Sequence, residues 1–319
     1  MCKIADATVI PPAVFQDMGR RLSNWGRWGA DDRIGTLNHI TPDLVAAAAQ
    51  SVESGRIVNL GLPISGAGIQ VGNGGRINPV HLMSVTPLDV PGREDEGHFA
   101  DDFIFMPLQS VTQWDGLAHV GYGGYFYNET PVASVTTASG STRLSIDQIA
   151  QRGIAGRGVL IDVARCKGVD RLEAGYEITV ADLNEALAMQ GASVQPGDIV
   201  LVRTGWLRTW SVDGDARRYW NGAPGLALKV AEWLHAHDIA AVASDNWCVE
   251  VQYPAPAEFS IPLHYVLIRD MGMTLGEIFV LDELAEVCAE VGRWNFFFTA
   301  PPLLVVGGVG SPITPLAIF

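Results

Sequence analysis

The sequence predicts a single-domain α/β fold. Of its 319 residues, 48% are hydrophobic and 18% are charged, so the chain can bury a large core and lacks the composition of a disordered protein. Short apolar runs that suit buried strands alternate with segments that suit helices, most regularly after Gly156. No repeat or linker interrupts this pattern. We therefore expect one domain over residues 1–319, with residues 1–60 as a helical segment packed on it.

The N-terminal third is predicted to hold two helices and a loop-rich region. The first helix is expected over Pro12–Ser23. The second is expected over Thr41–Glu53, because Thr41 can cap a helix and Pro42 suits the first helical position. Residues 61–100 are rich in Gly and Pro and are predicted to form strands joined by long loops.

The rest of the chain is predicted to alternate strands with helices, which is typical of an α/β sheet. Strands are expected over Gly158–Val163, Asp198–Arg203, Ile239–Ser244, Trp294–Thr299 and Leu303–Val306. Helices are expected over Thr179–Gln190, Leu226–His237 and Asp282–Val291.

The charge balance narrows the class of partner. The formal net charge is −14, and no basic stripe is available to neutralise phosphates. We therefore expect no nucleic-acid partner and no binding to anionic membranes. No apolar run is long enough to span a bilayer, and the first residues lack the apolar segment of a signal peptide. A cytoplasmic enzyme acting on a small-molecule substrate is the default expectation.

Several common catalytic motifs are absent. There is no phosphate-binding G-x-x-x-x-G-K-[ST] and no G-x-S-x-G nucleophile motif, and the glycines of 66–75 are interpreted as a loop. The four cysteines lie far apart without a C-x-x-C pair, so we expect no disulfide framework. Cys248 fits a buried structural thiol better than a nucleophile.

The segment from Gln109 to His119 is the most informative stretch. Side chains with ligand atoms recur at Gln109, Gln113, Asp115 and His119, among apolar and aromatic neighbours such as Trp114. An Asp and a His in such surroundings must be paired, hydrogen-bonded or bound to a metal. Their spacing of four suits one helix face or a shaped loop, and by itself it fits a buried polar pair better than a metal site.

A second polar pair follows much later in the chain. His264 stands at the start of one apolar run, and Glu277 stands at the start of another. A buried Glu is costly without a cation, so Glu277 needs a partner.

These segments resemble the cyclase-like metal hydrolases, which include bacterial kynurenine formamidase, isatin hydrolase and a trans-dienelactone hydrolase. The signature of that family is H-x-G-T-H-x-D-x-P-x-H, followed much later by a His and a Glu. The resemblance covers nearly the whole chain and implies a swivelling β/β/α fold with a mixed sheet core and flanking helices. Further matching blocks are Pro196–Trp206, Pro224–Leu226, Ala243–Asp245 and Gly310–Leu316.

The departures from the signature concern its metal ligands. Aligned on Asp115, the first two signature histidines fall on Gln109 and Gln113, and only Asp115 and His119 remain as strong ligands. His264 and Glu277 match the later pair. In two-metal members, the first two histidines and the Asp hold one ion, and the Asp, third His, later His and Glu hold the other. Because an amide oxygen binds a metal more weakly than imidazole, we expect one ion.

The resemblance therefore implies one divalent ion, Zn²⁺ or Mn²⁺, held by Asp115, His119, His264 and Glu277. It implies hydrolysis of a cyclic amide, a lactone or an N-acyl amide through a metal-activated water. Glu277 or His119 is expected to carry the proton, and Gln113 to hydrogen-bond the water or the oxyanion. The substrate pocket is expected to include Trp25, Trp28, His81, Gln109, Trp114 and Tyr122, although core packing explains the aromatic residues equally well.

Two other functions stay open at this point. A metal-dependent lyase, dehydratase or cyclase needs the same pairing of a metal with a base. A binding homologue that has lost catalysis is also consistent with the glutamines at 109 and 113. Since family members are commonly oligomeric, a homodimer or homotetramer is implied by the resemblance alone.

Overall fold

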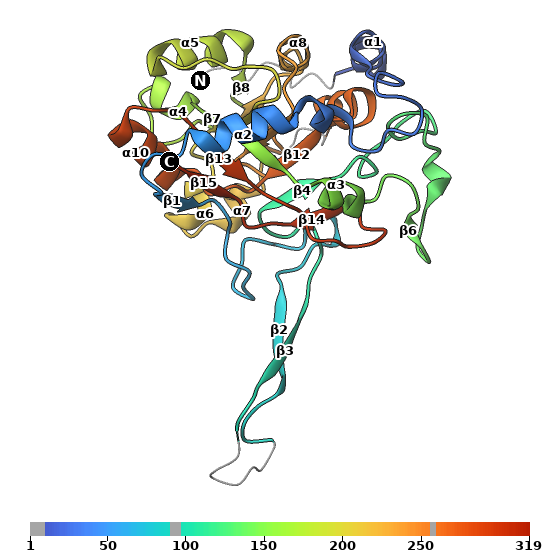
Figure 1. Ribbon diagram of the computed structural model, residues 1–319, viewed down its shortest axis with the longest axis vertical. Helices are drawn as coiled ribbons and strands as arrows, with labels where there is room; N and C mark the ends of the chain where they lie inside the picture. The colour runs from blue at the N-terminus through green and yellow to red at the C-terminus, as the bar shows by residue number, and fades with distance from the viewer. Residues whose placement is uncertain (1–9, 90–96, 256–259) are drawn as a thin grey trace.

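The computed structural model describes residues 10–89, 97–255 and 260–319. A nine-stranded mixed sheet forms its centre (Figure 1). Across the sheet, the strands are β1 (Ile57–Asn59), β15 (Leu316–Ile318), β13 (Asn295–Thr299), β7 (Ala155–Asp162), β9 (Ile199–Arg203), β11 (Ala241–Ser244), β12 (Thr274–Glu277), β4 (Gln113–Asp115) and β14 (Gly310–Pro312). The four strands β7, β9, β11 and β12 run parallel, and antiparallel strands extend the sheet on both sides.

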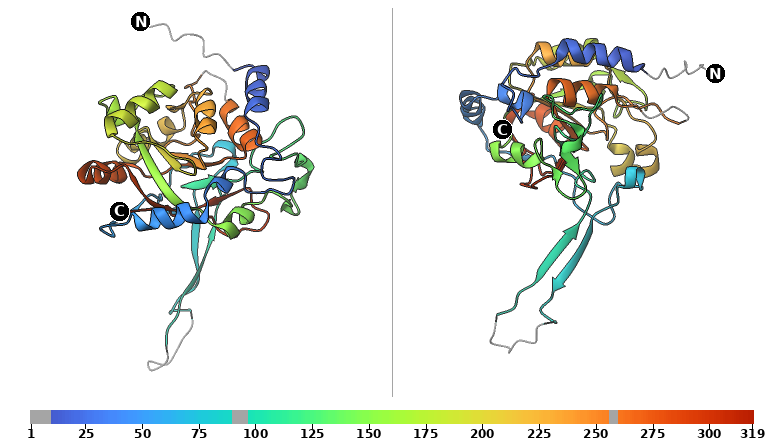
Figure 2. Two further views of the ribbon diagram at one scale, coloured as in Figure 1. Left: turned by 45° about the horizontal axis from the view of Figure 1, so that its top comes forward. Right: turned by 90° about the vertical axis from the view of Figure 1, so that its right-hand side faces the viewer.

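Helices cover this sheet, so the predicted α/β fold is confirmed (Figures 1 and 2). The α-helices are α1 (Pro12–Leu22), α2 (Pro42–Gln50), α3 (Ile146–Arg152), α4 (Val163–Cys166), α5 (Val180–Gln190), α6 (Arg208–Ser211), α7 (Ala216–Tyr219), α8 (Val230–Ala236), α9 (Pro262–His264) and α10 (Asp282–Val291). The 3₁₀ helices are η1 (Gly35–His39), η2 (Asn73–Gly75) and η3 (Val132–Ser134), and η4 (Tyr265–Met271) is a π-helix. No helix in the described ranges is long and apolar enough to cross a membrane.

Local sequence signals explain where the longer elements begin. The Thr179 hydroxyl accepts a hydrogen bond from the Asp182 N–H, and the Asp182 carboxylate accepts one in return from the Thr179 N–H, which forms a capping box for α5. At the start of α2, the Thr41 hydroxyl accepts a hydrogen bond from the Leu44 N–H, and Pro42 takes the first helical position. The parallel strands are almost wholly buried, as expected when helices cover a parallel sheet.

A two-stranded arm projects from the body on the opposite side from α5 and α8 (Figures 1 and 2). It consists of β2 (Val80–Val85) and β3 (Asp101–Phe105), paired antiparallel. Two further two-stranded pairings are small and lie on the body. They join β8 (Glu177–Ile178) with β10 (Gly225–Leu226), and β5 (Val135–Thr136) with β6 (Gly140–Ser141). The arm therefore stands apart from the main sheet and its helices (Figure 1).

Three sequence predictions need correction. Leu303–Val306 forms no strand; the apolar run lies at the surface, with Val306 86% exposed, so it fits no sheet position. The helix predicted over Leu226–His237 begins only at Val230, because Leu226 pairs in β10. Residues 61–100 contain one strand of the arm rather than several, within the part of that segment that the structure describes.

Candidate metal centre

The pairing of β4 with β12 brings three of the predicted polar residues together. In this antiparallel register, Glu277 lies opposite Gln113, and Gly276 lies opposite Trp114. Because side chains alternate along a strand, Gln113, Asp115 and Glu277 share one face of the sheet. Trp114 turns to the other face, where a Cβ on Gly276 would lie 2.6 Å from its ring. The glycine therefore allows the two strands to pair here.

Gln113 binds Glu277 directly. Its Nε2 donates a hydrogen bond of 2.7 Å to Glu277 Oε2 and lies 3.5 Å from Asp115 Oδ1. All three side chains are buried. Its Oε1 and the Oδ2 of Asp115 are also buried, yet they have no hydrogen-bond partner. Buried polar atoms are rarely left unpaired, so these two oxygens indicate that the site is built for a further group.

His264 enters the site from the end of α9. Its Nε2 lies 3.3 Å from Glu277 Oε1, and its Nδ1 lies 2.5 Å from Glu250 Oε1. The Glu250 carboxylate also accepts hydrogen bonds from the backbone N–H groups of Leu263 and His264, at 3.0 and 2.9 Å. Glu250 therefore fixes both the backbone and the ring of His264, and it leaves Nε2 directed towards Glu277.

Asp115, His264 and Glu277 lie close enough together to hold a metal ion between them. Each offers one ligand atom, and these atoms lie within 4.8 Å of one another. His119 stands beside this group, with its Nε2 3.7 Å from Asp115 Oδ1, and its side chain is 21% exposed. The ligand atoms of Cys248, Glu250 and His264 also lie within 4.8 Å of one another, but the Glu250 oxygens already accept hydrogen bonds from the Leu263 and His264 N–H groups and from the His264 ring.

The charges of the site are strongly perturbed. Burial raises the pKa of Asp115 to about 6, and nearby Glu277 adds to this, although His119 opposes it. Burial lowers the pKa of His119. For His264, burial acts to lower the pKa, but the hydrogen bonds to Glu250 and Glu277 outweigh it and raise the value to about 10. Without a metal, the excess negative charge is therefore balanced by a proton on His264.

A cavity of about 570 Å³ opens onto this group. His119, His264 and Glu277 line it, together with Cys248 and Ile261, two tryptophans and the loop around η2. The two tryptophans are Trp220 and Trp247, whose ring centroids lie 5.2 Å apart. A larger cavity of about 750 Å³ lies beside α1 and contains none of the residues predicted as ligands.

Arg76 directly follows η2, and its positively charged side chain lines the 570 Å³ cavity. It is close enough to lower the pKa of both Asp115 and His119. Among the described residues, no hydrogen bond or ion pair engages its guanidinium. A half-buried arginine with free donors suits an anionic group of a ligand.

The structure does not bring the other predicted substrate-binding residues into this cavity. Trp25 donates its Nε1–H to the backbone oxygen of Arg269, and Trp28 packs edge-on against His39. Trp114 is fully buried, and its Nε1–H donates a hydrogen bond to the backbone oxygen of Ala300. These tryptophans therefore pack within the fold.

Three further predicted residues also lie outside the cavity lining. The Tyr122 hydroxyl donates to Asp270, and His81 pairs with Asp102 on the arm at 2.7 Å. Gln109 lies against β14, where a Cβ on Gly310 would come within 2.5 Å of its Nε2. Gln113, predicted to bind a water or an oxyanion, instead binds Glu277 through its amide N–H.

Backbone strain marks the two segments that carry the site carboxylates. Val249 and Ile278 have φ angles of 53° and 58°, and they directly adjoin Glu250 and Glu277. β-Branched residues rarely adopt this region, and such strain collects at functional sites. The positive φ angles of Val249 and Ile278 therefore support a functional site at these two segments. The sequence alone gives no sign of this strain.

Comparisons with known proteins identify the family and the fold of the chain. The family model "Cyclase", described as "Putative cyclase", matches residues 58–251. A crystal structure of a novel cyclase is 40% identical, covering 93% of this chain and 99% of that chain with a TM-score of 0.85. No curated protein sequence matches the chain.

Two more distant structures share the fold. Isatin hydrolase A from Ralstonia solanacearum is 21% identical over 86% of this chain and 95% of its own, with a TM-score of 0.61. A predicted metal-dependent hydrolase from Bacillus stearothermophilus is 19% identical over 82% and 97%, with a TM-score of 0.52. The family match and the 40% identical relative together show that this chain belongs to the Cyclase family.

Proposed function

We propose that this chain is a metal-dependent hydrolase that opens a cyclic amide or lactone, or cleaves an N-acyl amide. The observation that carries the proposal is the buried group of Asp115, His264 and Glu277, in which Asp115 Oδ2 has no partner and the other two residues line a cavity. Two carboxylates and one imidazole suit a divalent cation, and catalytic zinc sites commonly use three protein ligands.

The three residues would hold one Zn²⁺ or Mn²⁺ ion. Such an ion lowers the pKa of a bound water and polarises a carbonyl group. The donor set of one imidazole and two carboxylates leaves these two metals close in preference. Glu250 would act as a positioning residue, because its bond to Nδ1 fixes the ring of His264, as outer carboxylates do for metal-bound histidines.

We assign the proton transfer to His119. It lines the cavity, is partly exposed and stands outside the group of three ligands. Burial lowers its pKa, so its ring is neutral at pH 7 and can accept a proton from the attacking water. The protonated ring would then return that proton to the leaving nitrogen or oxygen. The resemblance implies four ligands, including His119. With His119 assigned to proton transfer, the proposed ligands are the other three: Asp115, His264 and Glu277.

The lining of the cavity supports a proposal about the substrate. In the lining of the cavity, Trp220 and Trp247 offer apolar ring surface, and Arg76 offers unengaged donors. We propose that the substrate is a small ring compound whose carboxylate, or the carboxylate formed on hydrolysis, binds Arg76.

A substrate panel in ¹⁸O-labelled water tests the reaction class. The panel consists of cyclic imides, lactones and N-formyl aromatic amines, incubated with protein loaded with Zn²⁺ or Mn²⁺. We expect turnover of at least one class, with one ¹⁸O in the product carboxylate. Turnover without ¹⁸O incorporation would instead identify a lyase or cyclase, and no turnover of any class would favour a binding protein.

A further inference from the structure

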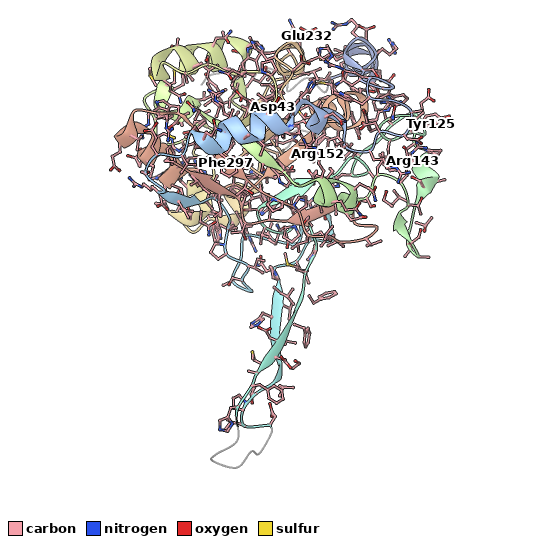
Figure 3. The ribbon with its side chains drawn as sticks, in the orientation of Figure 1. Asp43, Tyr125, Arg143, Arg152, Glu232 and Phe297 are labelled. Carbon is pink, nitrogen blue, oxygen red and sulfur yellow. The ribbon has the colours of Figure 1, made fainter. Side chains whose placement is uncertain are left out.

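Asn246 joins the two strained segments of the candidate metal centre. It lies just beyond β11, and it is fully buried. Figure 3 shows side chains filling the body of the molecule around the central sheet. In this interior, the side chain of Asn246 bonds the residue before Glu250, and its backbone oxygen bonds the residue after Glu277. One residue therefore contacts the chain next to both carboxylates.

The backbone makes a tight turn at Val249. The N–H of Glu250 donates a hydrogen bond to the backbone oxygen of Cys248, two residues earlier. With a φ of 53°, Val249 is the central residue of a γ-turn of the rare, strained kind. A β-branched residue keeps such a conformation only when its surroundings hold it there.

The side chain of Asn246 holds this turn. Its Oδ1 accepts hydrogen bonds from the Val249 N–H at 2.7 Å and from the Cys248 N–H at 3.4 Å. Its Nδ2 donates a hydrogen bond of 2.6 Å to the backbone oxygen of Pro224, which directly precedes β10. The Leu226 N–H in β10 in turn donates to the Val249 backbone oxygen at 3.0 Å. The amide therefore fastens the turn to the neighbouring segment.

The second link of Asn246 runs through its backbone. Its oxygen accepts a hydrogen bond of 2.8 Å from the N–H of Ile278, the strained residue that directly follows Glu277. Glu277 and Glu250 contact the two different nitrogens of the His264 ring. Asn246 therefore connects the two segments whose carboxylates hold this ring between them.

We propose that Asn246 is a positioning residue of the metal centre, which holds Val249 in its strained turn and thereby places Glu250 against His264. The proposal rests on the proposed function, because the centre is the proposed site of the metal. Without the amide, Val249 would relax to a negative φ and move the Glu250 carboxylate away from Nδ1. The ring of His264 would then lose the orientation that directs its Nε2 towards Glu277.

The test compares Asn246→Ala in two backgrounds. Alanine removes the side-chain bonds and keeps the backbone bond to Ile278. In the wild-type background, Asn246→Ala should raise the Kd for Zn²⁺ about tenfold or more, as lost outer-shell contacts do. In the Val249→Gly background, it should change the Kd by less than roughly threefold, because glycine adopts positive φ about as readily as negative φ. Competition with a chromophoric chelator measures the Kd.

NMR of the metal-free protein makes the test independent of metal binding. In protein labelled with ¹⁵N-histidine, the Nδ1–H that His264 donates to Glu250 should give a downfield proton signal, which His264→Ala identifies by its loss. Asn246→Ala should lose or shift this signal, and Asn246→Ala combined with Val249→Gly should keep it. If the wild type binds no Zn²⁺ and the signals still behave in this way, the proposed function fails while the positioning role of Asn246 stands.

Asn128→Ala is the matched control. Asn128 is also buried, its side chain bonds backbone groups of residues 26–32, and it lies outside the cavity lining. Its loss should lower thermal stability and leave the Kd and the NMR signal unchanged. Far-UV circular dichroism checks the folding of each variant. If Asn246→Ala does not fold, Asn246→Ser takes its place and should show smaller changes in the same direction, because a hydroxyl holds such turns more weakly.

Two results would overturn the proposal. A Kd and an NMR signal equal to those of the wild type would show that the Asn246 side chain does not position the centre. An equal loss of metal affinity in the wild-type and Val249→Gly backgrounds would show that Asn246 does not act through the turn at Val249.

Discussion

Glu250 Oε1 and His264 Nδ1 lie 2.5 Å apart in the interior of the protein. The same carboxylate accepts hydrogen bonds from the Leu263 and His264 N–H groups of α9. One side chain therefore holds both the helix and the imidazole ring of His264. This pair explains why His264 is directed towards Glu277. It also makes Glu250 the residue whose loss should disturb the centre most without removing a ligand.

Replacing Glu250 is expected to weaken metal binding while the three ligands stay in place. Glu250→Ala removes the acceptor for Nδ1–H and for two backbone N–H groups, and outer-shell losses of this kind typically cost about 10–100-fold in metal affinity. Glu250→Gln keeps one acceptor oxygen and should fall between Ala and wild type. Competition with a chromophoric chelator measures the Kd.

The control for this experiment is Glu283→Gln, on the exposed side of α10, which should leave the metal Kd unchanged. If Glu250→Ala binds metal as tightly as the wild type, Glu250 does not position His264.

Arg76→Ala is expected to raise KM for an anionic substrate and to change kcat little. A hydrogen bond to a charged group contributes about 1.5–3 kcal/mol, so KM should rise roughly 10–100-fold. Arg76→Lys should recover part of the loss, because it restores the charge but not the paired donors.

Arg33→Ala serves as the matched control, since Arg33 is exposed and lies outside the cavity lining. An equal KM for Arg76→Ala and wild type, or an equal effect on a neutral analogue, would contradict the role assigned to Arg76.

Metal affinity should rise with pH around neutrality. The pKa of His264 is raised to about 10, so its ring carries a proton at pH 7 in the metal-free protein, and metal binding must release that proton. The Kd should therefore fall about tenfold per pH unit between roughly pH 6.5 and 8. Below pH 6, protonation of Asp115, whose pKa is raised to about 6, should steepen the dependence.

Chelator competition across this range, corrected for the titration of the chelator, measures the slope. A pH-independent Kd would show that His264 is not a ligand.

The sequence was sufficient to predict the fold class and the polar residues that meet at the centre. Alternating strands and helices predicted the sheet, and Thr41 and Thr179 marked two helix starts through their capping chemistry. The pairs Asp115–His119 and His264–Glu277 were joined only through the family resemblance, because spacing along the chain does not determine which strands are neighbours.

The positioning residues required tertiary structure. Glu250 follows an irregular turn at Val249 and has no local motif, and Arg76 lies in a glycine-rich loop that resembles any surface loop. The aromatic residues failed as a guide for a different reason. Tryptophan serves core packing and pockets equally well, so Trp25, Trp28 and Trp114 could not be told from Trp220 and Trp247 by sequence.

The metal content of two histidine variants tests the central claim most directly. After reconstitution with Zn²⁺ or Mn²⁺ and removal of excess ion, elemental analysis should find one ion per chain in the wild type and in His119→Ala, and none in His264→Ala. His119→Ala should be inactive despite its metal. Loss of the ion from His119→Ala would return His119 to the ligand set. Absence of any bound ion from the wild type would contradict the metal centre itself.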